Sequence, residues 1–318
     1  MTRVSKLLSL VLDDYRINDK KSQASLDCRL KHLAHFDSMP AHSVGNEHVT
    51  SYIKKRLNDG AQNATINREL AALKYAFRLG YEHKPRLVRE LLQFSRLKEN
   101  PARKGFVRDA QYGILAECAT ELWLKGLLAT GYEFGFRSGE LTGLKVGQVD
   151  LKDCTICLDP GHTKNDEGRT IKMTTEVYDL LRQCVAGKSA DDYVFTTEGK
   201  PVLDFRGAWW ALWVKAGVGE YVGKDKRGKQ LYEGLLFHDL RRSAVRNMVA
   251  AGIPDVVCMK ITGHKSRSVF DRYNVVSTSD VAEATQKLEN RKLQVKMQLT
   301  PKLAPAIQKQ GRKSLKTA

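Results

Sequence analysis

The chain has 318 residues, enough for one large domain or two domains of ordinary size. Its hydrophobic content of 42% is typical of globular proteins and argues against a chain that is disordered throughout. The formal net charge of +17 favours a polyanionic partner, nucleic acid first, and no apolar run is long enough to predict a membrane-spanning helix.

The first 95 residues show only helical periodicity. Apolar residues recur three and four positions apart, and Gly60 and Gly80 mark the ends of the third and fourth predicted helices. We therefore predict a four-helix DNA-binding domain over residues 1–95. If the protein binds DNA, basic residues on the polar faces of these helices are candidate phosphate contacts, namely Lys54, Lys55, Arg68 and Lys74.

The periodic pattern lapses after residue 95. Residues 96–107 contain Pro101 and an excess of basic side chains, which is typical of a linker between domains. Along a DNA backbone these side chains would add affinity without selecting sequence. The candidates in the linker are Arg96, Lys98, Arg103 and Lys104.

Residues 108–291 mix helices and strands. Helical patterns cover about 108–145, and two apolar runs then flank a Gly-, Asp- and Asn-rich turn at 159–169, as in a β-hairpin. Helices follow over 177–185 and 205–217, then two more that end at Gly252 and Gly263, and a last one around 279–291. Residues 290–318 carry eight Lys or Arg and no acid, so we expect a flexible basic tail over 292–318.

Two patterns suggest sites that we do not predict. Cys154 and Cys157 have C-x-x-C spacing but no second pair or histidine pair, so we expect no metal site. Residues 223–230 have the spacing of a phosphate loop, but Gln230 stands where Ser or Thr would hold magnesium, and we interpret them as a solvated basic loop. The scattered cysteines favour the reducing cytoplasm as the compartment.

The second half contains residue types that can break a phosphodiester. Arginine can bind two phosphate oxygens with its planar fork, lysine or histidine can transfer a proton, and tyrosine can serve as a nucleophile if a base is nearby. Each residue alone is a weak signal, but they occur in a fixed order. The set is Arg137, Lys164, His238, Arg241, His264 and Tyr273.

This ordered set resembles that of the tyrosine recombinases, the family of phage and mobile-element integrases and chromosome-dimer resolvases. The segments GFRSGEL, HTKNDEGR and FHDLRRSAV are similar to family motifs, and GHKSRSVFDRY keeps the nine-residue step from His to Tyr. The resemblance covers about residues 5–290. It implies a mainly α fold with a small antiparallel β-sheet, in which an N-terminal helical core-binding domain precedes an α+β catalytic domain.

The resemblance also implies a role for each residue of the set. Tyr273 would attack the scissile phosphate and form a 3′-phosphotyrosyl bond, while Arg137 and Arg241 hold the non-bridging oxygens. Lys164 would protonate the leaving 5′-oxygen. His238 would assist proton removal from Tyr273, and His264 would hydrogen-bond the phosphate. No cofactor is implied, because the phosphotyrosyl bond keeps the energy needed to rejoin the strands.

The expected partner is double-stranded DNA, bound by a homo-tetramer on paired sites, and accessory DNA-bending proteins are a further candidate partner. Two alternatives stay open. A type IB topoisomerase shares the chemistry, although the His-x-x-Arg spacing and the helix after Tyr273 favour a recombinase. Residues 253–273 could instead form a helix-turn-helix in a DNA-binding regulator, which has no need of the whole catalytic set.

Overall fold

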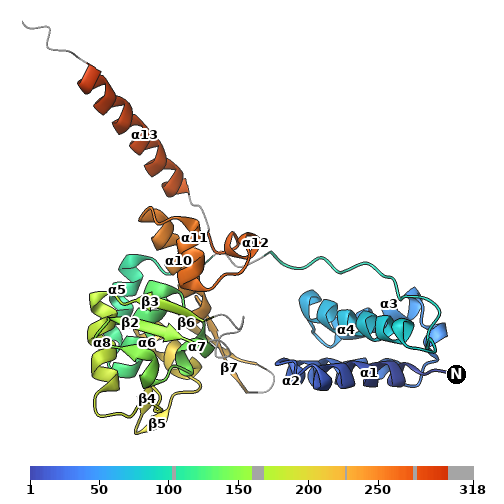
Figure 1. The fold of residues 1–318 in the computed structure, drawn as a ribbon. Coiled ribbons are helices and arrows are strands. Elements are labelled where there is room, and N and C mark those ends of the chain that lie inside the picture. Colours follow the sequence, from blue (N-terminus) through green and yellow to red (C-terminus); the bar gives the residue numbers. More distant parts are fainter. Residues whose placement is uncertain (102–104, 160–167, 226–227, 275–277, 300–318) are drawn as a thin grey trace, which may run out of the picture. The chain divides into compact units, whose positions relative to one another are not determined.

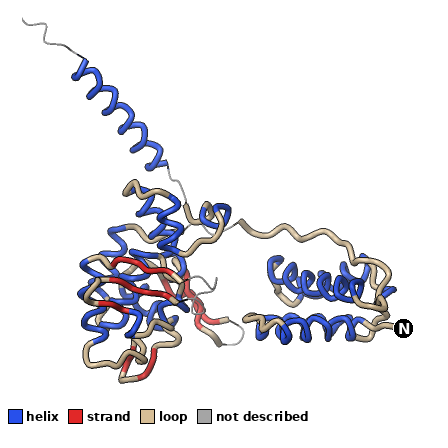
Figure 2. The backbone as a smooth tube through the Cα atoms, viewed as in Figure 1, coloured by secondary structure: helices blue, strands red, loops and turns tan. Residues whose placement is uncertain are grey.

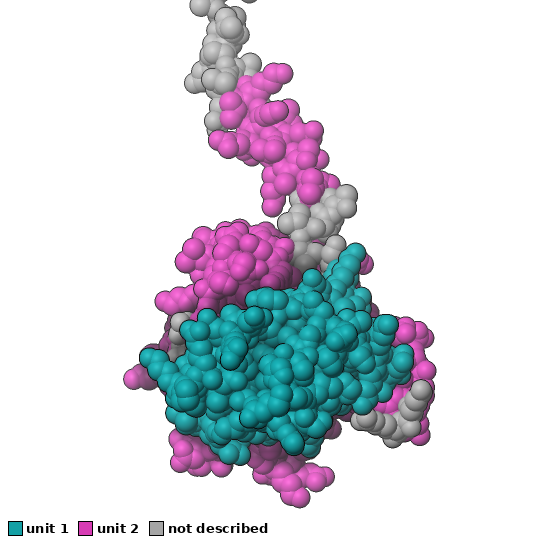
Figure 3. Space-filling view, turned by 90° about the vertical axis from the view of Figure 1, so that its right-hand side faces the viewer, with its two compact units in different colours: residues 1–102 teal, residues 103–318 magenta. Residues whose placement is uncertain are grey.

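The computed structural model divides the chain into two compact units, Met1–Ala102 and Arg103–Ala318, which are coloured separately in Figure 3. The structure describes residues 1–101, 105–159, 168–225, 228–274 and 278–299. Helices dominate both units, and the described strands form small antiparallel sheets (Figure 2). The fold class expected from the sequence is therefore confirmed.

The first unit is a bundle of four helices (Figure 1). Its core contains Leu7, Leu26, Tyr52, Ile66 and Leu70, all fully buried, which lie at the helical spacing that the sequence shows. The helices are α1 (Val4–Ile17), α2 (Gln23–Leu33), α3 (Asn46–Asn58) and α4 (Asn63–Glu82).

An extended segment packs along α4 and completes this unit. The Asn67 amide donates to the backbone carbonyl of Leu97 at 2.8 Å and accepts from its N–H at 2.9 Å. The Lys74 ammonium donates to the carbonyl of Phe94 at 2.8 Å. The beginning of the predicted linker is thus fixed to the helical bundle by side chains that satisfy its backbone groups.

The second unit, which contains the strands labelled in Figure 1, is built around helix α6 (Leu122–Phe134). The residues of α6 are buried almost all round. Its main neighbours are α8 (Thr175–Val185) and α10 (Leu240–Ala250). The remaining helices are α5 (Asp109–Cys118), α7 (Ser138–Thr142), α9 (Arg206–Lys215), α11 (Asp255–Thr262), α12 (Arg267–Phe270) and α13 (Thr278–Leu299). A three-stranded antiparallel sheet, in the order β1 (Val149–Asp150), β2 (Thr155–Leu158) and β3 (Arg169–Lys172), accompanies them.

The register of β2 and β3 fixes the base of the predicted hairpin. Ile156 lies opposite Ile171 and Leu158 opposite Arg169, so that the inner positions Ile156, Leu158 and Ile171 join the core. The turn of this hairpin, at residues 160–167, lies outside the described residues.

Two expectations from the sequence hold only in part. The segment 223–230, expected as a loop, connects an antiparallel hairpin of β6 (Glu220–Lys224) and β7 (Gln230–Glu233), with an irregularity between Tyr221 and Gly223. Its first two residues and its last belong to the strands, and the described residues 225, 228 and 229 lie between them. A second pair, β4 (Thr196–Thr197) with β5 (Lys200–Pro201), is also present. Helix α13 continues to Leu299, so residues 292–299 of the expected tail are helical, whereas 300–318 lie outside the described residues.

Among the described helices, none has the length and the apolar composition that crossing a membrane requires.

Candidate active site

The structure brings together five of the six predicted catalytic residues. Arg137 is the N-cap residue of α7, His238 belongs to a 3-10 turn (Phe237–Asp239) and Arg241 to the first turn of α10. His264 and Tyr273 follow α11 and α12. Lys164, the sixth, lies outside the described residues, in the chain between β2 and β3.

Two left-handed glycines allow the sharp turns at this site. Gly135 ends α6 with φ 64°, and a Cβ there would lie 3.3 Å from the Arg241 backbone. Gly263 ends α11 with φ 68° and redirects the chain into His264. Both positions favour glycine because other residues rarely adopt positive φ at a helix end.

The candidate nucleophile and base are in direct contact. The Nε2 atom of His238 lies 2.9 Å from the Tyr273 hydroxyl oxygen, and the two rings meet edge to face. This is the distance across which a histidine can accept a proton from the group that it activates.

The His238 imidazole is held in its neutral form. Although the side chain reaches solvent, the surrounding protein atoms desolvate the imidazolium, and the positive charge of Arg241 disfavours it further, so the pKa of His238 is lowered. Asp239 opposes this shift without reversing it. A neutral ring at physiological pH can accept the tyrosine proton.

Arg241 is buried beneath the tyrosine, with 1% of its surface exposed. Its guanidinium lies 5.6 Å from the centre of the Tyr273 ring and donates from one η nitrogen to the Gly135 carbonyl at 2.6 Å. Its other η nitrogen is buried and has no hydrogen-bond partner within the described part of the chain. Burial and the charge of Arg137 lower the pKa of Arg241, yet a guanidinium stays protonated at neutral pH.

His264 forms a chain of hydrogen bonds that fixes its tautomer. Its Nε2 atom accepts from Nε of Arg241 at 3.2 Å, so the ring proton is assigned to Nδ1, which donates to the Thr262 hydroxyl at 2.7 Å. That hydroxyl in turn donates to the Cys258 carbonyl at 2.7 Å. Burial and the charge of Arg241 lower the pKa of His264 to about 3. In this arrangement neither ring nitrogen is free to donate to a phosphate.

Arg137 is oriented by a buried carboxylate that the sequence analysis did not single out as a site residue. Glu140 accepts from the Arg137 guanidinium at 2.8 Å and from its backbone N–H at 3.0 Å. The same carboxylate accepts from Arg169 at 2.7 Å. Glu140 stands three residues after a helix N-cap, and this position could have predicted that its carboxylate accepts from the backbone N–H of Arg137. Arg169, which lies 29 residues from Glu140, gave no such signal.

A cavity of about 440 Å³ opens over this cluster. Arg137, His238, His264 and Tyr273 line it together with Lys265 and Ser266. Arg241 is not among the lining residues, because the Tyr273 and His264 rings cover it. Because Arg137 and Lys265 line the cavity and Arg241 lies beneath the Tyr273 ring, the chemistry of the cavity suits an oxyanion.

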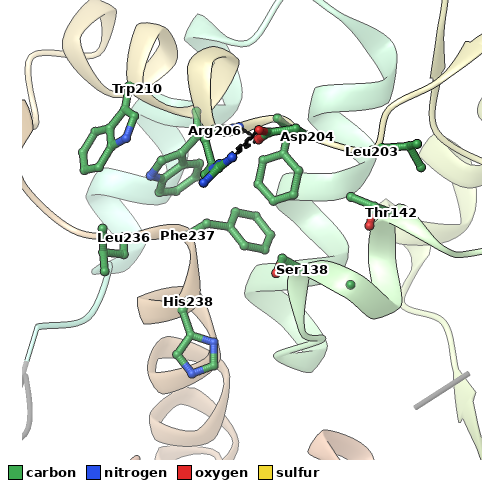
Figure 4. Close-up of a pocket in the computed structure, with 12 residues that line it drawn as sticks. Ser138, Thr142, Leu203, Asp204, Arg206, Trp210, Leu236, Phe237 and His238 are labelled. Carbon is green, nitrogen blue, oxygen red and sulfur yellow. Dashed lines mark hydrogen bonds and ion pairs between the residues drawn. The ribbon is translucent and has the colours of Figure 1, made fainter. Parts of the chain in front are cut away.

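A second hollow of about 500 Å³ shares Ser138 and His238 with the first (Figure 4). Its wall contains Phe205, Trp209 and Phe237, and Arg206 pairs with Asp204 at its edge (Figure 4). No group of three or more His, Cys, Asp or Glu that could bind a metal occurs within the described ranges.

The structure describes six of the eight candidate DNA contacts, all of them in the first unit. Lys54, Lys55 and Arg68 are exposed on α3 and α4, and Lys98 is exposed on the extended segment. Lys74 is half-buried and donates to the Phe94 carbonyl, whereas Arg96 is exposed and pairs with Glu99 at 2.9 Å. Arg103 and Lys104 lie outside the described residues.

Comparison with known proteins agrees with this geometry. The family model described as the phage integrase family matches residues 108–279, more than half of the chain. A curated relative, tyrosine recombinase XerA of Saccharolobus solfataricus, is 26% identical over 147 residues. That match covers 46% of this chain and 44% of the relative, so less than half of the relative's length is matched.

Solved structures share the fold. An integrase of the Tn1549 transposon in complex with transposon right-end DNA matches with a TM-score of 0.70 at 18% identity, covering 90% of this chain and 99% of that one. A lambda integrase tetramer bound to a Holliday junction matches with a TM-score of 0.62 at 14% identity, covering 84% and 78%. With the match to the family model over residues 108–279, the chain belongs to the phage integrase family.

Proposed function

We propose that this protein is a tyrosine-type site-specific recombinase that cleaves and rejoins DNA through a 3′-phosphotyrosyl intermediate at Tyr273. The observation that carries the proposal is the 2.9 Å contact between Tyr273 and His238 at the wall of a cavity that Arg137 lines. This contact supports the proposal because a nucleophile, a neutral base and a phosphate-binding cation would then surround one small volume.

Cleavage would begin with the phosphate in the cavity. The Tyr273 oxygen attacks phosphorus while its proton passes to Nε2 of His238, and the bond from phosphorus to the 5′-oxygen breaks. Lys164 supplies the proton that the leaving oxygen needs. Attack by the 5′-hydroxyl of another strand on the phosphotyrosyl bond reverses these steps and completes an exchange.

Arg137 and Arg241 would hold the non-bridging oxygens, where negative charge grows in the transition state. Arg137 already faces the cavity. Arg241 has an unpaired η nitrogen to offer, but it is covered in this structure, so the Tyr273 or His264 ring has to shift before a phosphate reaches it. The hydrogen bond expected from His264 to the phosphate likewise requires that its bond to Arg241 be exchanged.

The partner of this reaction would be double-stranded DNA, and the exposed Lys54, Lys55, Arg68 and Lys98 would contact its backbone. The lambda integrase match is a tetramer, which supports a homo-tetramer on paired sites as the working assembly here. Accessory DNA-bending proteins are a further proposal. The compartment that we propose is the cytoplasm, as the cysteine content predicts.

The test is covalent trapping. Nicked duplexes made from the DNA junctions that flank the gene are incubated with the protein, and adducts that resist denaturation are counted. The wild-type protein should form such adducts. Tyr273→Phe should form none while binding DNA normally, because only the nucleophilic oxygen is lost. Tyr221→Phe, at an exposed tyrosine of the same unit, is the matched control and should cleave normally. An adduct with the Tyr273 variant would reject the proposal.

The same assay separates a recombinase from a topoisomerase. A type IB topoisomerase would relax supercoiled plasmid that lacks the junction sequences, whereas a recombinase should form adducts and exchange strands only with DNA that carries them.

A further inference from the structure

Arg169 is a buried cation that does not line the candidate active-site cavity, yet it contacts two parts of the machinery around it. It begins strand β3 and is 8% exposed. Its Nε donates to the Ile261 carbonyl at 2.9 Å, and its two η nitrogens donate to the Glu140 carboxylate at 3.3 and 2.7 Å. The guanidinium also lies 5.0 Å from the centre of the Phe136 ring. Five N–H donors in a rigid plane suit this role, and a lysine could not reproduce it.

The first contact leads to Arg137. Glu140 is shared by Arg169 and Arg137, and burial alone would favour its protonated form. The hydrogen bonds and charge of Arg169, together with the bonds from Arg137, outweigh burial and lower the pKa of Glu140. Without Arg169, Glu140 would keep one buried partner, and the carboxylate would be free to turn toward Arg137 and away from its present orientation.

The second contact leads to the turn after α11. Arg169 holds the Ile261 carbonyl, and a Cβ on Gly263 would lie 2.7 Å from an Arg169 η nitrogen, so the guanidinium is packed directly against this turn. The Gly263 carbonyl in turn accepts from Arg137 at 3.1 Å. Arg137 is therefore held from two sides, by Glu140 and by Gly263, and Arg169 contacts both.

We infer that Arg169 is a positioning residue, which fixes the orientation of Arg137 toward the phosphate through Glu140 and the turn at Gly263. This inference rests on the proposed function, since it presupposes that Arg137 neutralises the phosphate. A positioning role differs from a merely structural one in its response to the substrate. The cleavage defect of an Arg169 variant should disappear when the scissile phosphate carries no negative charge for Arg137 to neutralise.

The experiment compares two substrates in single-turnover cleavage, ordinary DNA and DNA with a methylphosphonate at the scissile position, which lacks one negative charge. On ordinary DNA, Arg169→Met should cleave on the order of 100-fold more slowly than wild type, as expected when a catalytic group is misplaced by about 1 Å. On the methylphosphonate its rate should return close to that of wild type. Arg169→Lys keeps the buried charge and guards against loss of folding, and it should show a smaller defect with the same rescue.

A double variant supplies a second readout. If Arg169 acts through Arg137, then Arg137→Ala with Arg169→Met should be no slower than Arg137→Ala alone, because the interaction has already been removed. Arg182→Met is the control, since Arg182 is an exposed arginine of the same unit that pairs only loosely with Asp179 at 3.6 Å. It should cleave both substrates normally.

The failures are distinguishable. Three outcomes would overturn the role of Arg169. In one, Arg169→Lys cleaves ordinary DNA at the wild-type rate, and in another both Arg169 variants show the same defect on the two substrates. The third outcome is a double variant that cleaves much more slowly than Arg137→Ala. Failure of methylphosphonate to rescue Arg137→Ala itself would instead reject the phosphate-binding role of Arg137. Absence of any adduct with wild-type protein would reject the proposed function.

Discussion

The Nε2 atom of His238 lies 2.9 Å from the hydroxyl of Tyr273, and the ring that carries it is neutral at physiological pH because burial and the charge of Arg241 lower its pKa. A base with a lowered pKa stays unprotonated as the pH falls through 6.5, the ordinary value of a histidine. Cleavage by the wild-type protein should therefore persist below pH 6.5 and decline only at the lower pKa of His238.

This pH dependence can be measured in two ways. Single-turnover cleavage between pH 4.5 and 8 gives the acid limb, and the imidazole NMR signals of the Tyr273→Phe variant give the titration of His238 directly. A midpoint at or above 6.5 in both would contradict the proposed electrostatic effect of the site.

Lys164 can be tested although it lies outside the described residues. Lys164→Ala should cleave ordinary DNA slowly but regain activity on a 5′-bridging phosphorothiolate, because a thiolate leaves without a proton. His238→Ala should gain nothing from that substrate, since His238 serves the attacking oxygen. Rescue of His238→Ala without rescue of Lys164→Ala would mean that the acid and the base are exchanged, and equal rescue of both would contradict the assignment of separate roles.

The exposed pair Lys54 and Lys55 should act through phosphate. Each contact contributes about 0.9 to the slope of log affinity against log salt, so replacing both lysines by alanine should flatten the slope by about 1.8. Lys74→Ala should leave the slope unchanged and lower stability, because its ammonium binds the Phe94 carbonyl. Anisotropy titrations over a range of salt concentrations give the slope for each variant. If Lys74→Ala flattened the slope more than the double lysine variant, the phosphate contact would have to be assigned to Lys74.

The first unit depends on a buried ion pair. Glu69 accepts from Arg56 at 2.9 and 3.0 Å and from the Tyr52 hydroxyl at 2.7 Å, and it is 1% exposed. Glu69→Ala leaves the buried Arg56 with its bond to the half-exposed Asp59 at 3.2 Å, and should lower the free energy of unfolding of this unit by about 3–5 kcal/mol. Glu82→Ala, which removes an exposed pair with Arg78, should cost less than about 1 kcal/mol.

The two units can be followed separately in this measurement. All four tryptophans of the chain lie in the second unit, at positions 123, 209, 210 and 213. Circular dichroism should show an earlier transition in the Glu69 variant, while the transition seen by tryptophan fluorescence should stay in place. A shift in the fluorescence transition alone would contradict this account.

The sequence was sufficient where local rules decide the structure. Apolar spacing and the glycines at 80, 252 and 263 predicted helix ends that the structure has close by, and the turn residues between Leu158 and Arg169 predicted a hairpin. The meeting of His238 and Tyr273, 35 residues apart, followed only from the resemblance to a family. No periodicity reports such a contact.

The contacts that could not be predicted from the sequence join residues that lie far apart along the chain. Arg169 contacts Ile261 across 92 residues, and the backbone of Leu97 is satisfied by Asn67 rather than by a neighbouring strand. Basic composition concealed regular structure at two places. The basic residues at 223–230 did not reveal that strands extend to Lys224 and resume at Gln230, and those after 291 suggested a tail where α13 continues. A solvated charged face is compatible with regular structure, so charge alone does not exclude it.

The charge balance of the active site also has a consequence for stability. Arg137 and Arg169 share the carboxylate of Glu140, and their charges are among the causes that lower the pKa of Arg241. Like charges held together in a buried place oppose folding, so we expect this cluster to lower the stability of the second unit. An oxyanion that enters the cavity would relieve the repulsion. We therefore expect an oxyanion that binds in the cavity to stabilise the folded second unit.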